Sequence, residues 1–286
     1  MRVLIFAAGL GTRLKPITDT IPKALVPIGG KPLLEHLIIK LKNEGFTDFV
    51  INIHHFADKI VDFVKKNDSF DVNISFSDER DLLRDTGGGI KHAARLLNDG
   101  EPFLVHNVDI ISNLDINKFY RSQYELNSAT FSGASSIPLA LLLVSNRDTD
   151  RYLLFDNDNN LCAWVNLKTG EFKTPFNDLK WDYESAKETI MKNNSNNIRE
   201  DLELFFNDNG LQKYAFAGVH SISPMVFPLM LKWPDKFSII DFYLSVADKY
   251  DIKAYIDNNL NIIDVGRIEN LKEAEILLQE NRKSDD

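Results

Sequence analysis

The order of strand-like and helix-like segments in the first part of the chain most restricts its fold. Apolar runs typical of strands alternate with segments whose apolar residues repeat at helical spacing. The expected strands are residues 2–7, 49–53, 72–76 and 102–106, and the expected helices include residues 33–41, 60–64 and 90–97. This alternation predicts a mainly parallel sheet with helices on both faces, a three-layer αβα arrangement. Ligands of such sheets bind at the carboxyl ends of the strands.

Composition sets further bounds. The chain has 286 residues, 44% of them hydrophobic, which is enough for a real core. Because no run reaches the roughly 18 apolar residues of a membrane span, and no apolar signal segment stands at the N-terminus, we expect a soluble cytoplasmic protein. Cys162 is the only cysteine, which excludes an intramolecular disulfide. The net charge of -9 argues against nucleic-acid or anionic-membrane partners.

The segment after the first expected strand combines small residues with cations. It runs through Ala7–Leu14, and the pair Pro22-Lys23 and the stretch Gly29–Leu33 follow. The first 31 residues of the chain carry five cations, Arg2, Arg13, Lys15, Lys23 and Lys31, against the single acid Asp19. Exposed backbone N–H groups and fixed positive charge both stabilise a polyphosphate. We therefore predict that this segment holds a nucleotide by its phosphates.

Two common phosphate-binding motifs do not fit this segment. A Walker loop would place Gly at Leu25 and Ser or Thr at Pro32 around the Gly30-Lys31 pair. The dinucleotide fingerprint begins at Gly9 and Gly11, but Leu14 occupies its third glycine position.

The order of the loop Gly9–Leu14, the pair Pro22-Lys23 and the stretch Gly29–Leu33 resembles the signature of the sugar-1-phosphate nucleotidyltransferases. These pyrophosphorylases make nucleotide sugars. The resemblance implies a Rossmann-like domain with a smaller sugar-binding lobe, a nucleoside triphosphate and a sugar 1-phosphate as partners, and Mg²⁺ as cofactor. It is strong over residues 1–115 and moderate over 214–280. The hexapeptide repeats that some members append are absent from the sequence.

The resemblance assigns roles to charged residues. Asp109 and Asp264 match positions that hold Mg²⁺ in the family, although an Asp at a strand end is otherwise more often a helix cap or turn former. Arg13 and Lys23 match the cations on the phosphates, with Arg13 near the leaving pyrophosphate and Lys23 near the α-phosphate. Arg13, Lys23 and Asp109 are therefore the predicted catalytic residues.

The same resemblance predicts the substrate pockets. The nucleotide-binding residues are expected to be Ala8, Gly9, Gly11, Thr12, Arg13, Asn52, Gly87 and Gly88. Gly87 and Gly88 belong to a glycine-rich turn before the helix at Ile90, and Asn52 is the weaker base-contact candidate. Gly218 resembles the family's sugar-pocket glycine.

The sequence departs from the family at the sugar site. Many members carry Glu-Lys-Pro on a middle strand, where this chain has Ala163–Asn166. Neither charge is present, so sugar recognition must differ. Arg151 is the candidate replacement for the missing cation, and a surface Arg on a hairpin is the alternative. His106 is expected to be a hydrogen-bonded packing residue.

The expected organisation is a single domain over residues 1–286. Residues 1–135 form its nucleotide-binding half, 136–260 a hairpin-rich sugar-binding lobe with an irregular insertion at 175–213, and 261–286 a closing strand and helix. The motifs look most like the compact subgroup of N-acetylmuramate-1-phosphate uridylyltransferases and mannose- or heptose-1-phosphate guanylyltransferases. UTP with an N-acetylmuramate-type sugar phosphate and GTP with mannose or heptose 1-phosphate are the favoured substrate pairs. The alternatives are a non-catalytic nucleotide-sugar-binding protein and a cytidylyltransferase acting on a phospho-alcohol such as phosphocholine.

Overall fold

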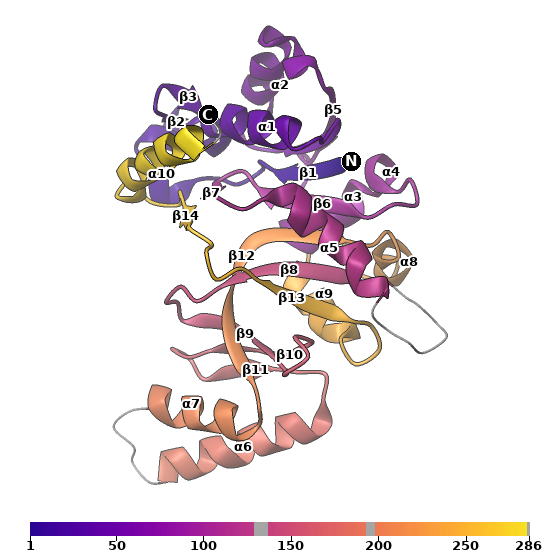
Figure 1. The fold of residues 1–286 in the computed structure, drawn as a ribbon, viewed down its shortest axis with the longest axis vertical. Helices are drawn as coiled ribbons and strands as arrows, with labels where there is room; N and C mark the ends of the chain where they lie inside the picture. Colours follow the sequence, from indigo (N-terminus) through magenta and orange to yellow (C-terminus); the bar gives the residue numbers. More distant parts are fainter. Residues whose placement is uncertain (129–136, 193–197, 285–286) are drawn as a thin grey trace. The chain divides into compact units, whose positions relative to one another are not determined.

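The computed structural model describes residues 1–128, 137–192 and 198–284, which form two compact units (Figure 1). Unit 1 contains Met1–Ile137, Gly218–Ser238 and Asn258–Asp286. Unit 2 contains Pro138–Ala217 and Ile239–Asp257. The chain thus returns twice to unit 1, and the closing strand and helix belong to the same unit as the N-terminal loop.

A largely parallel sheet forms the centre of unit 1. Its parallel strands are β6 (Phe103–Asn107), β1 (Arg2–Phe6), β4 (Asp48–Ile53) and β5 (Asn73–Asp78), in that order. Residues 219–222 of β12 (Gln212–Ile222) pair antiparallel with β6. The prediction of a mainly parallel mixed sheet is confirmed.

The strand register aligns the carboxyl ends of the central strands. Phe6 lies opposite Asn52 on β4 and opposite Asn107 on β6. The segments that follow β1 and β6 therefore begin at the same edge of the sheet as Asn52. This is the edge at which the sequence analysis predicts ligand binding.

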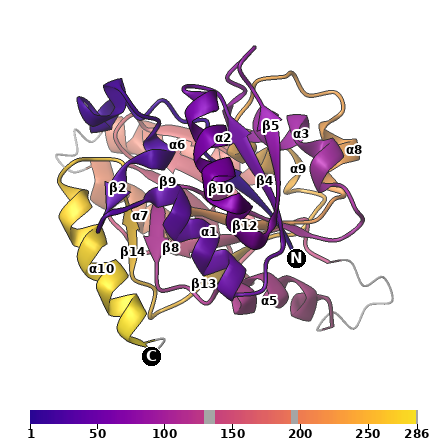
Figure 2. The ribbon, with the colours of Figure 1, turned by 90° about the horizontal axis from the view of Figure 1, so that it is seen from above.

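Helices cover both faces of this sheet. α1 (Leu33–Asn43) and α5 (Ile116–Ser128) lie on one side, where the Asn117 side chain donates to the Glu44 carbonyl oxygen, and the helical segment between β5 and β6 lies on the other; α2 spans Ala57–Lys66 (Figures 1 and 2). Amphipathic spacing explains their packing: α1 buries Leu34, Leu37, Ile38 and Leu41. The remaining helices of unit 1 are α3 (Asp85–His92), α4 (Ala94–Leu97), α8 (Val226–Met230) and α10 (Asn270–Ser284).

Short elements connect the main strands and helices of unit 1. Single 3-10 turns occur at η1 (Thr12–Leu14), η2 (Ile17–Asp19), η3 (Lys23–Leu25) and η4 (Asp68–Asp71). Two small antiparallel pairs join β2 (Pro27–Ile28) to β3 (Lys31–Pro32) and β7 (Ile110–Ser112) to β14 (Ile262–Asp264). Sequence patterns did not reveal β2, β3 or β7, because strands of two or three residues carry no measurable periodicity.

Unit 2 is built from hairpins, as expected. Its antiparallel strands run in the order β11 (Glu171–Lys173), β10 (Leu161–Asn166), β9 (Arg151–Phe155) and the first residues of β12. β8 (Ala140–Ser145) pairs in parallel with β13 (Ile252–Ile256). α9 spans Ile239–Val246.

The stretch 175–213, expected to be irregular, contains two helices. α6 spans Asn177–Lys192 and α7 spans Ile198–Asp208. Both contribute to a core that includes Tyr183, Leu202 and Phe206. The polar composition of this stretch did not predict helices. They form because the apolar residues of α6 and α7 pack into this core, and tertiary packing outweighs local preference. The asparagines 193, 194, 196 and 197 lie outside the described residues.

The glycine-rich segment also differs from its expected form. α3 begins at Asp85 and includes Gly87, Gly88 and Gly89, so these residues form a helical turn instead of a loop before Ile90. Glycine is unfavourable in a helix, and backbone contacts from a distant segment hold the turn in place. Among the residues described, no helix combines the length and apolarity that crossing a bilayer requires.

Candidate nucleotide-binding site

A pocket of about 400 Å³ opens in unit 1 at the carboxyl ends of the central strands. The segments leaving β1 and β6 and the end of β4 line it, together with the turn at the start of α3. The lining residues are Phe6, Ala7, Ala8, Gly9, Lys23, Asn52, Glu79, Leu83, Asp85, Thr86, Asn107, Val108, Asp109 and Lys236. The pocket thus includes the predicted residues Ala8, Gly9, Lys23, Asn52 and Asp109.

Lys23 and Asp109 form an ion pair inside this pocket. Lys23 begins η3 directly after Pro22, and Asp109 stands two residues beyond β6. Their side chains are only 11% and 16% exposed. Because both charges are largely shielded from water, the attraction between the ammonium and the carboxylate is stronger than it would be at the surface.

The loop from Gly9 to Leu14 folds against η2. The Gly11 carbonyl accepts hydrogen bonds from the Leu14 N–H at 2.9 Å and from the Thr18 hydroxyl at 2.8 Å. Thr12 and Arg13 begin the exposed turn η1. Gly11, Thr12 and Arg13 therefore follow the pocket-lining part of the loop and do not themselves line this pocket.

Arg13 and Asp264 both approach Gly266. A Cβ added at Gly266 would lie 2.7 Å from both Arg13 Nη2 and Asp264 Oδ1. Only a glycine leaves room for the two charged groups to approach there. The Val265 N–H also donates to the Asp109 carbonyl oxygen at 2.8 Å. The structure therefore brings Arg13, Asp109 and Asp264 into one neighbourhood from three segments.

The two carboxylates suit Mg²⁺. Across the described ranges, no group of three or more His, Cys, Asp or Glu side chains is placed to hold a metal. Mg²⁺ commonly uses one or two protein carboxylates and takes its other ligands from water and substrate phosphates. The hard oxygen donors of Asp109 and Asp264, with Lys23 paired to Asp109, fit an ion that binds together with a phosphate substrate.

Asn52 lines the pocket, whereas Gly87 and Gly88 do not line it and only follow its lining residue Thr86; the polar groups of Asn52 and the backbone N–H groups of both glycines bind other parts of the protein. The Asn52 carboxamide bonds to the backbone of Ala7 and Ala8 and to Glu79. The N–H groups of Gly87 and Gly88 donate to the Phe237 carbonyl oxygen at 2.9 and 3.2 Å. Direct contacts from these residues to a base stay predictions, and their observed contacts stabilise the pocket wall.

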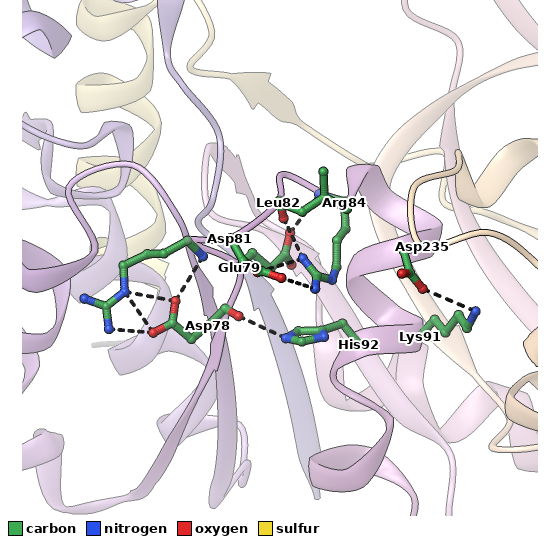
Figure 3. Close-up of polar contacts among 9 residues, drawn as sticks. Asp78, Glu79, Asp81, Leu82, Arg84, Lys91, His92 and Asp235 are labelled. Carbon is green, nitrogen blue, oxygen red and sulfur yellow. Dashed lines mark hydrogen bonds and ion pairs between the residues drawn. The ribbon is translucent and has the colours of Figure 1, made fainter.

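The segment around Phe237 brings a cation that the sequence did not reveal. The Lys91 amine donates to the Trp233 carbonyl at 2.5 Å and lies 3.7 Å from Asp235 (Figure 3). These contacts fasten the segment to α3 and leave Lys236 on the pocket lining. Lys236 is far from every motif in the sequence, so no local signal could have assigned it to the site.

Glu79, Asp85, Thr86 and Asn107 are further lining residues without a sequence assignment. Asn107 also contacts the region of Gly218, where an added Cβ would lie 2.6 Å from Asn107 Nδ2. Gly218 thus lies beside the pocket, and its contact with a sugar stays a prediction. Arg151 begins β9 in unit 2 with an exposed side chain, and its role also stays a prediction.

His106 is a packing residue, as expected. It is 1% exposed, and its Nδ1–H donates to the Asn107 carbonyl oxygen at 2.8 Å. Burial lowers the pKa of His106 to about 4, so the ring is neutral at physiological pH. Asn107 is the last residue of β6, so this hydrogen bond helps to fix the end of the strand that precedes Asp109.

Comparison with known proteins agrees with this geometry. Residues 2–137 match the family model described as nucleotidyl transferase. The N-acetylmuramate alpha-1-phosphate uridylyltransferase of Neisseria meningitidis serogroup B is 39% identical over 138 residues, which are 48% of this chain and 54% of that protein. The mannose-1-phosphate guanyltransferase of Saccharomyces cerevisiae is 42% identical over 113 residues, which are 39% of this chain and 31% of that one. The chain thus spans about half the length of the first relative and about a third of the second.

Solved structures extend the likeness of the fold over nearly the whole chain. HddC from Yersinia pseudotuberculosis, in complex with GMP-PN, aligns with a TM-score of 0.65 at 24% identity and covers 96% of this chain and 98% of its own. A putative glucose-1-phosphate thymidylyltransferase from Bacillus anthracis aligns with a TM-score of 0.70 at 17% identity, over 98% and 96% of the two chains. The predicted α/β fold is therefore confirmed. The residues that match the nucleotidyl transferase family model, 2–137, include the loop Gly9–Leu14, Lys23 and Asp109.

Proposed function

We propose that this chain transfers a nucleoside monophosphate from a nucleoside triphosphate to a sugar 1-phosphate in a Mg²⁺-dependent reaction that releases pyrophosphate. The observation that carries the proposal is the Lys23–Asp109 ion pair, which lies in the pocket lined by Ala8 and Gly9. A site that only bound a nucleotide would have little need for a shielded carboxylate beside the phosphates. A carboxylate that holds Mg²⁺ next to a fixed cation is what phosphoryl chemistry requires.

The reaction needs no protein nucleophile. An anionic oxygen of the sugar phosphate attacks the α-phosphorus, a new P–O bond forms, and the bond to the bridging oxygen breaks as pyrophosphate leaves with the electron pair. Because the second pKa of a phosphate ester is about 6, the attacking oxygen is already deprotonated at neutral pH. The residues therefore act by positioning and charge neutralisation.

Lys23 and Arg13 are assigned to neutralise charge on different phosphate groups. Lys23, fixed inside the pocket, is suited to the α-phosphate and the incoming sugar phosphate. Arg13, at the exposed turn η1, is suited to the leaving pyrophosphate because its guanidinium can bind two oxygens at once. Asp109 and Asp264 would hold the Mg²⁺, which when bound neutralises phosphate charge and orients the triphosphate.

The favoured substrate pairs are UTP with an N-acetylmuramate-type sugar phosphate and GTP with mannose or heptose 1-phosphate. Support comes from relatives that match part of the chain, a uridylyltransferase and a guanyltransferase at about 40% identity. On the sugar side, Ala163–Asn166 lies within β10 and carries no charged residue. The sugar phosphate therefore needs another cation, and Arg151 on the neighbouring strand β9 is our candidate.

Pyrophosphate release tests the proposal. UTP, GTP, CTP and dTTP are each combined with N-acetylmuramate, mannose, heptose and glucose 1-phosphates, and CTP is also combined with phosphocholine. We expect release with one of the favoured pairs in Mg²⁺, and loss of the signal on chelation. Nucleotide binding without release under every condition would support a non-catalytic binding protein. Release with phosphocholine alone would support a cytidylyltransferase for phospho-alcohols.

A further inference from the structure

Asn52 is oriented by the backbone of the chain that enters the nucleotide loop. Its Oδ1 accepts hydrogen bonds from the N–H groups of Ala7 at 2.6 Å and Ala8 at 3.0 Å. Asn52 is 3% exposed, so water cannot replace these bonds. Since both neighbours of Oδ1 are obligate donors, the carboxamide cannot flip. Its Nδ2 must therefore face the other way, as a donor.

Glu79 satisfies that donor and one more. Its Oε1 accepts from Asn52 Nδ2 at 2.9 Å, and its Oε2 accepts from the Arg84 N–H at 3.1 Å. Glu79 is 1% exposed. A position with one fixed donor on each side requires two acceptor oxygens, which a carboxylate has and a carboxamide does not. A glutamine at this position would have to point its NH₂ group at another donor.

The surroundings leave little room for Glu79 to move. The Leu82 N–H donates to the Glu79 carbonyl at 3.0 Å, and the Arg84 guanidinium binds the Leu82 carbonyl and the Asp81 carboxylate, which closes the loop on itself (Figure 3). On the other side, a Cβ added at Gly89 would lie 3.0 Å from Glu79 Oε1. The carboxylate is thus held between the loop and the glycine turn of α3.

We propose that Asn52 and Glu79 are a positioning pair for the nucleotide site. Their hydrogen bonds fix the backbone at Ala7 and Ala8 and so fix the direction in which the chain enters Gly9. The proposal rests on the function proposed above, because it assigns the nucleoside triphosphate to this loop. Neither residue needs to touch a reacting atom. Their effect reaches the substrate through the backbone of the loop.

The pair can be reversed without changing its total charge, and this provides the test. In Glu79→Gln, an NH₂ group meets a donor. In Asn52→Asp, a carboxylate oxygen meets Glu79 Oε1. In the double variant N52D/E79Q, the introduced carboxylate accepts from the N–H groups of Ala7 and Ala8 and from the introduced amide, while the oxygen of that amide accepts from Arg84. Each single variant has a conflict that the double variant removes.

Kinetics give the first readout. We expect each single variant to raise the KM for the triphosphate about tenfold, with the KM for the sugar phosphate within about twofold, because one unsatisfied buried polar group costs on the order of one decade. The double variant is expected to return to within about threefold of the wild type. The control is Glu203→Gln, which removes a partly exposed carboxylate from α7 in unit 2 and is expected to leave both KM values unchanged.

Amide hydrogen exchange gives a second readout that does not depend on activity. The N–H groups of Ala7 and Ala8 are expected to exchange faster in each single variant and to regain wild-type protection in the double variant. Single variants with wild-type KM and exchange would overturn the proposal, as would a double variant worse than both. A change in the ratio of GTP to UTP turnover that the double variant keeps would also overturn it, since Glu79 would then read the base itself. If the wild type releases no pyrophosphate with any substrate, the proposed function fails, while the exchange rates still decide whether the pair fixes the loop.

Discussion

Val265 donates its backbone N–H to the carbonyl oxygen of Asp109 at 2.8 Å, although the two residues are far apart in the sequence. The next pair along the same strands aligns Asp264 with Ile110. The short pairing of β7 with β14 thus holds the segment of Asp264 beside the end of β6. The closing part of the chain thereby completes a site that the first part begins, and loss of this pairing is expected to separate the two carboxylates.

The metal assignment predicts that Asp109→Asn lowers turnover by at least about a hundredfold with little change in fold. The substitution keeps the shape of the side chain but removes the negative charge that Mg²⁺ and Lys23 both use. Turnover is measured across a Mg²⁺ titration, and circular dichroism checks the fold. Asp62→Asn on the exposed side of α2 is the matched control. Near-normal turnover of Asp109→Asn in saturating Mg²⁺ would exclude Asp109 as a ligand.

Removal of Lys23 and removal of Arg13 are expected to change different kinetic constants. Lys23→Ala chiefly lowers kcat, because its ammonium is assigned to charge at the reacting phosphate. Arg13→Ala raises the KM for the triphosphate and lowers kcat as well, because it is assigned to the pyrophosphate portion. Steady-state kinetics with each substrate varied in turn separate the two patterns. Lys15→Ala, which removes an exposed lysine paired with Asp19, is expected to match the wild type. Wild-type kinetics in both Lys23→Ala and Arg13→Ala would show that the loop is misassigned.

The architecture and the centre of the site were predictable because they depend on local patterns. Alternating apolar runs predicted parallel strands, and parallel strands bring Phe6, Asn52 and Asn107 to one edge. Lys23 and Asp109 were assigned to one site because each matches a motif of the family that the sequence resembles, and the structure pairs them. In these cases the residue types around each position are enough to predict where that position lies in the fold or in the site.

The parts that escaped prediction depend on contacts between distant segments. Glu79 and Lys236 carry no motif, and each reaches the pocket through hydrogen bonds made by its own loop to another segment. The triple glycine reads as a turn on propensity, whereas the Phe237 carbonyl holds its N–H groups in a helical turn. Asn-rich composition likewise concealed α6, whose buried Tyr183 is fixed by a core formed with α7. Tertiary packing outweighs local preference in each case.

Stability is expected to fall as the pH decreases below neutrality. Burial lowers the pKa of His106 to about 4 and that of His220 to about 3, from an ordinary value of 6.5. Between these values and 6.5, the unfolded state binds more protons than the folded state, so stability rises with pH in that window and is lost as the pH falls. The full loss is on the order of 3 kcal/mol for His106 and on the order of 5 kcal/mol for His220.

Urea unfolding at pH 7.0 and at about pH 4.5 measures this effect. His106→Gln is expected to reduce the difference between the two free energies of unfolding, because glutamine does not titrate. His55→Gln, at an exposed position, is expected to leave the difference unchanged. An unchanged difference in His106→Gln would mean that this histidine is not kept neutral by burial.

Gly266→Ala is expected to separate activity from stability. The new methyl group would crowd Arg13 Nη2 and Asp264 Oδ1, which lie 2.7 Å from its position. Both are ends of side chains that can rotate away, so the melting temperature changes little, but the cation and the carboxylate can no longer keep their places beside residue 266. We expect kcat to fall about tenfold or more and the Mg²⁺ requirement to rise. A variant with normal kcat and Mg²⁺ dependence would show that this arrangement has no role in the reaction.

The sugar phosphate provides the last prediction. Because β10 carries Ala163–Asn166 and no charge, another cation must meet this substrate, and Arg151 at the start of β9 is assigned to it. Removing a cation that touches only the sugar phosphate raises the KM for that substrate, leaves the KM for the triphosphate nearly unchanged, and lowers kcat if the contact strengthens in the transition state. Arg151→Ala is therefore expected to raise the sugar-phosphate KM about tenfold. Arg147→Ala, which removes another exposed arginine of unit 2, is the control. Equal effects of Arg151→Ala on both substrates, or none, would return Arg151 to the hairpin surface and leave the sugar phosphate to Lys23 and the Mg²⁺.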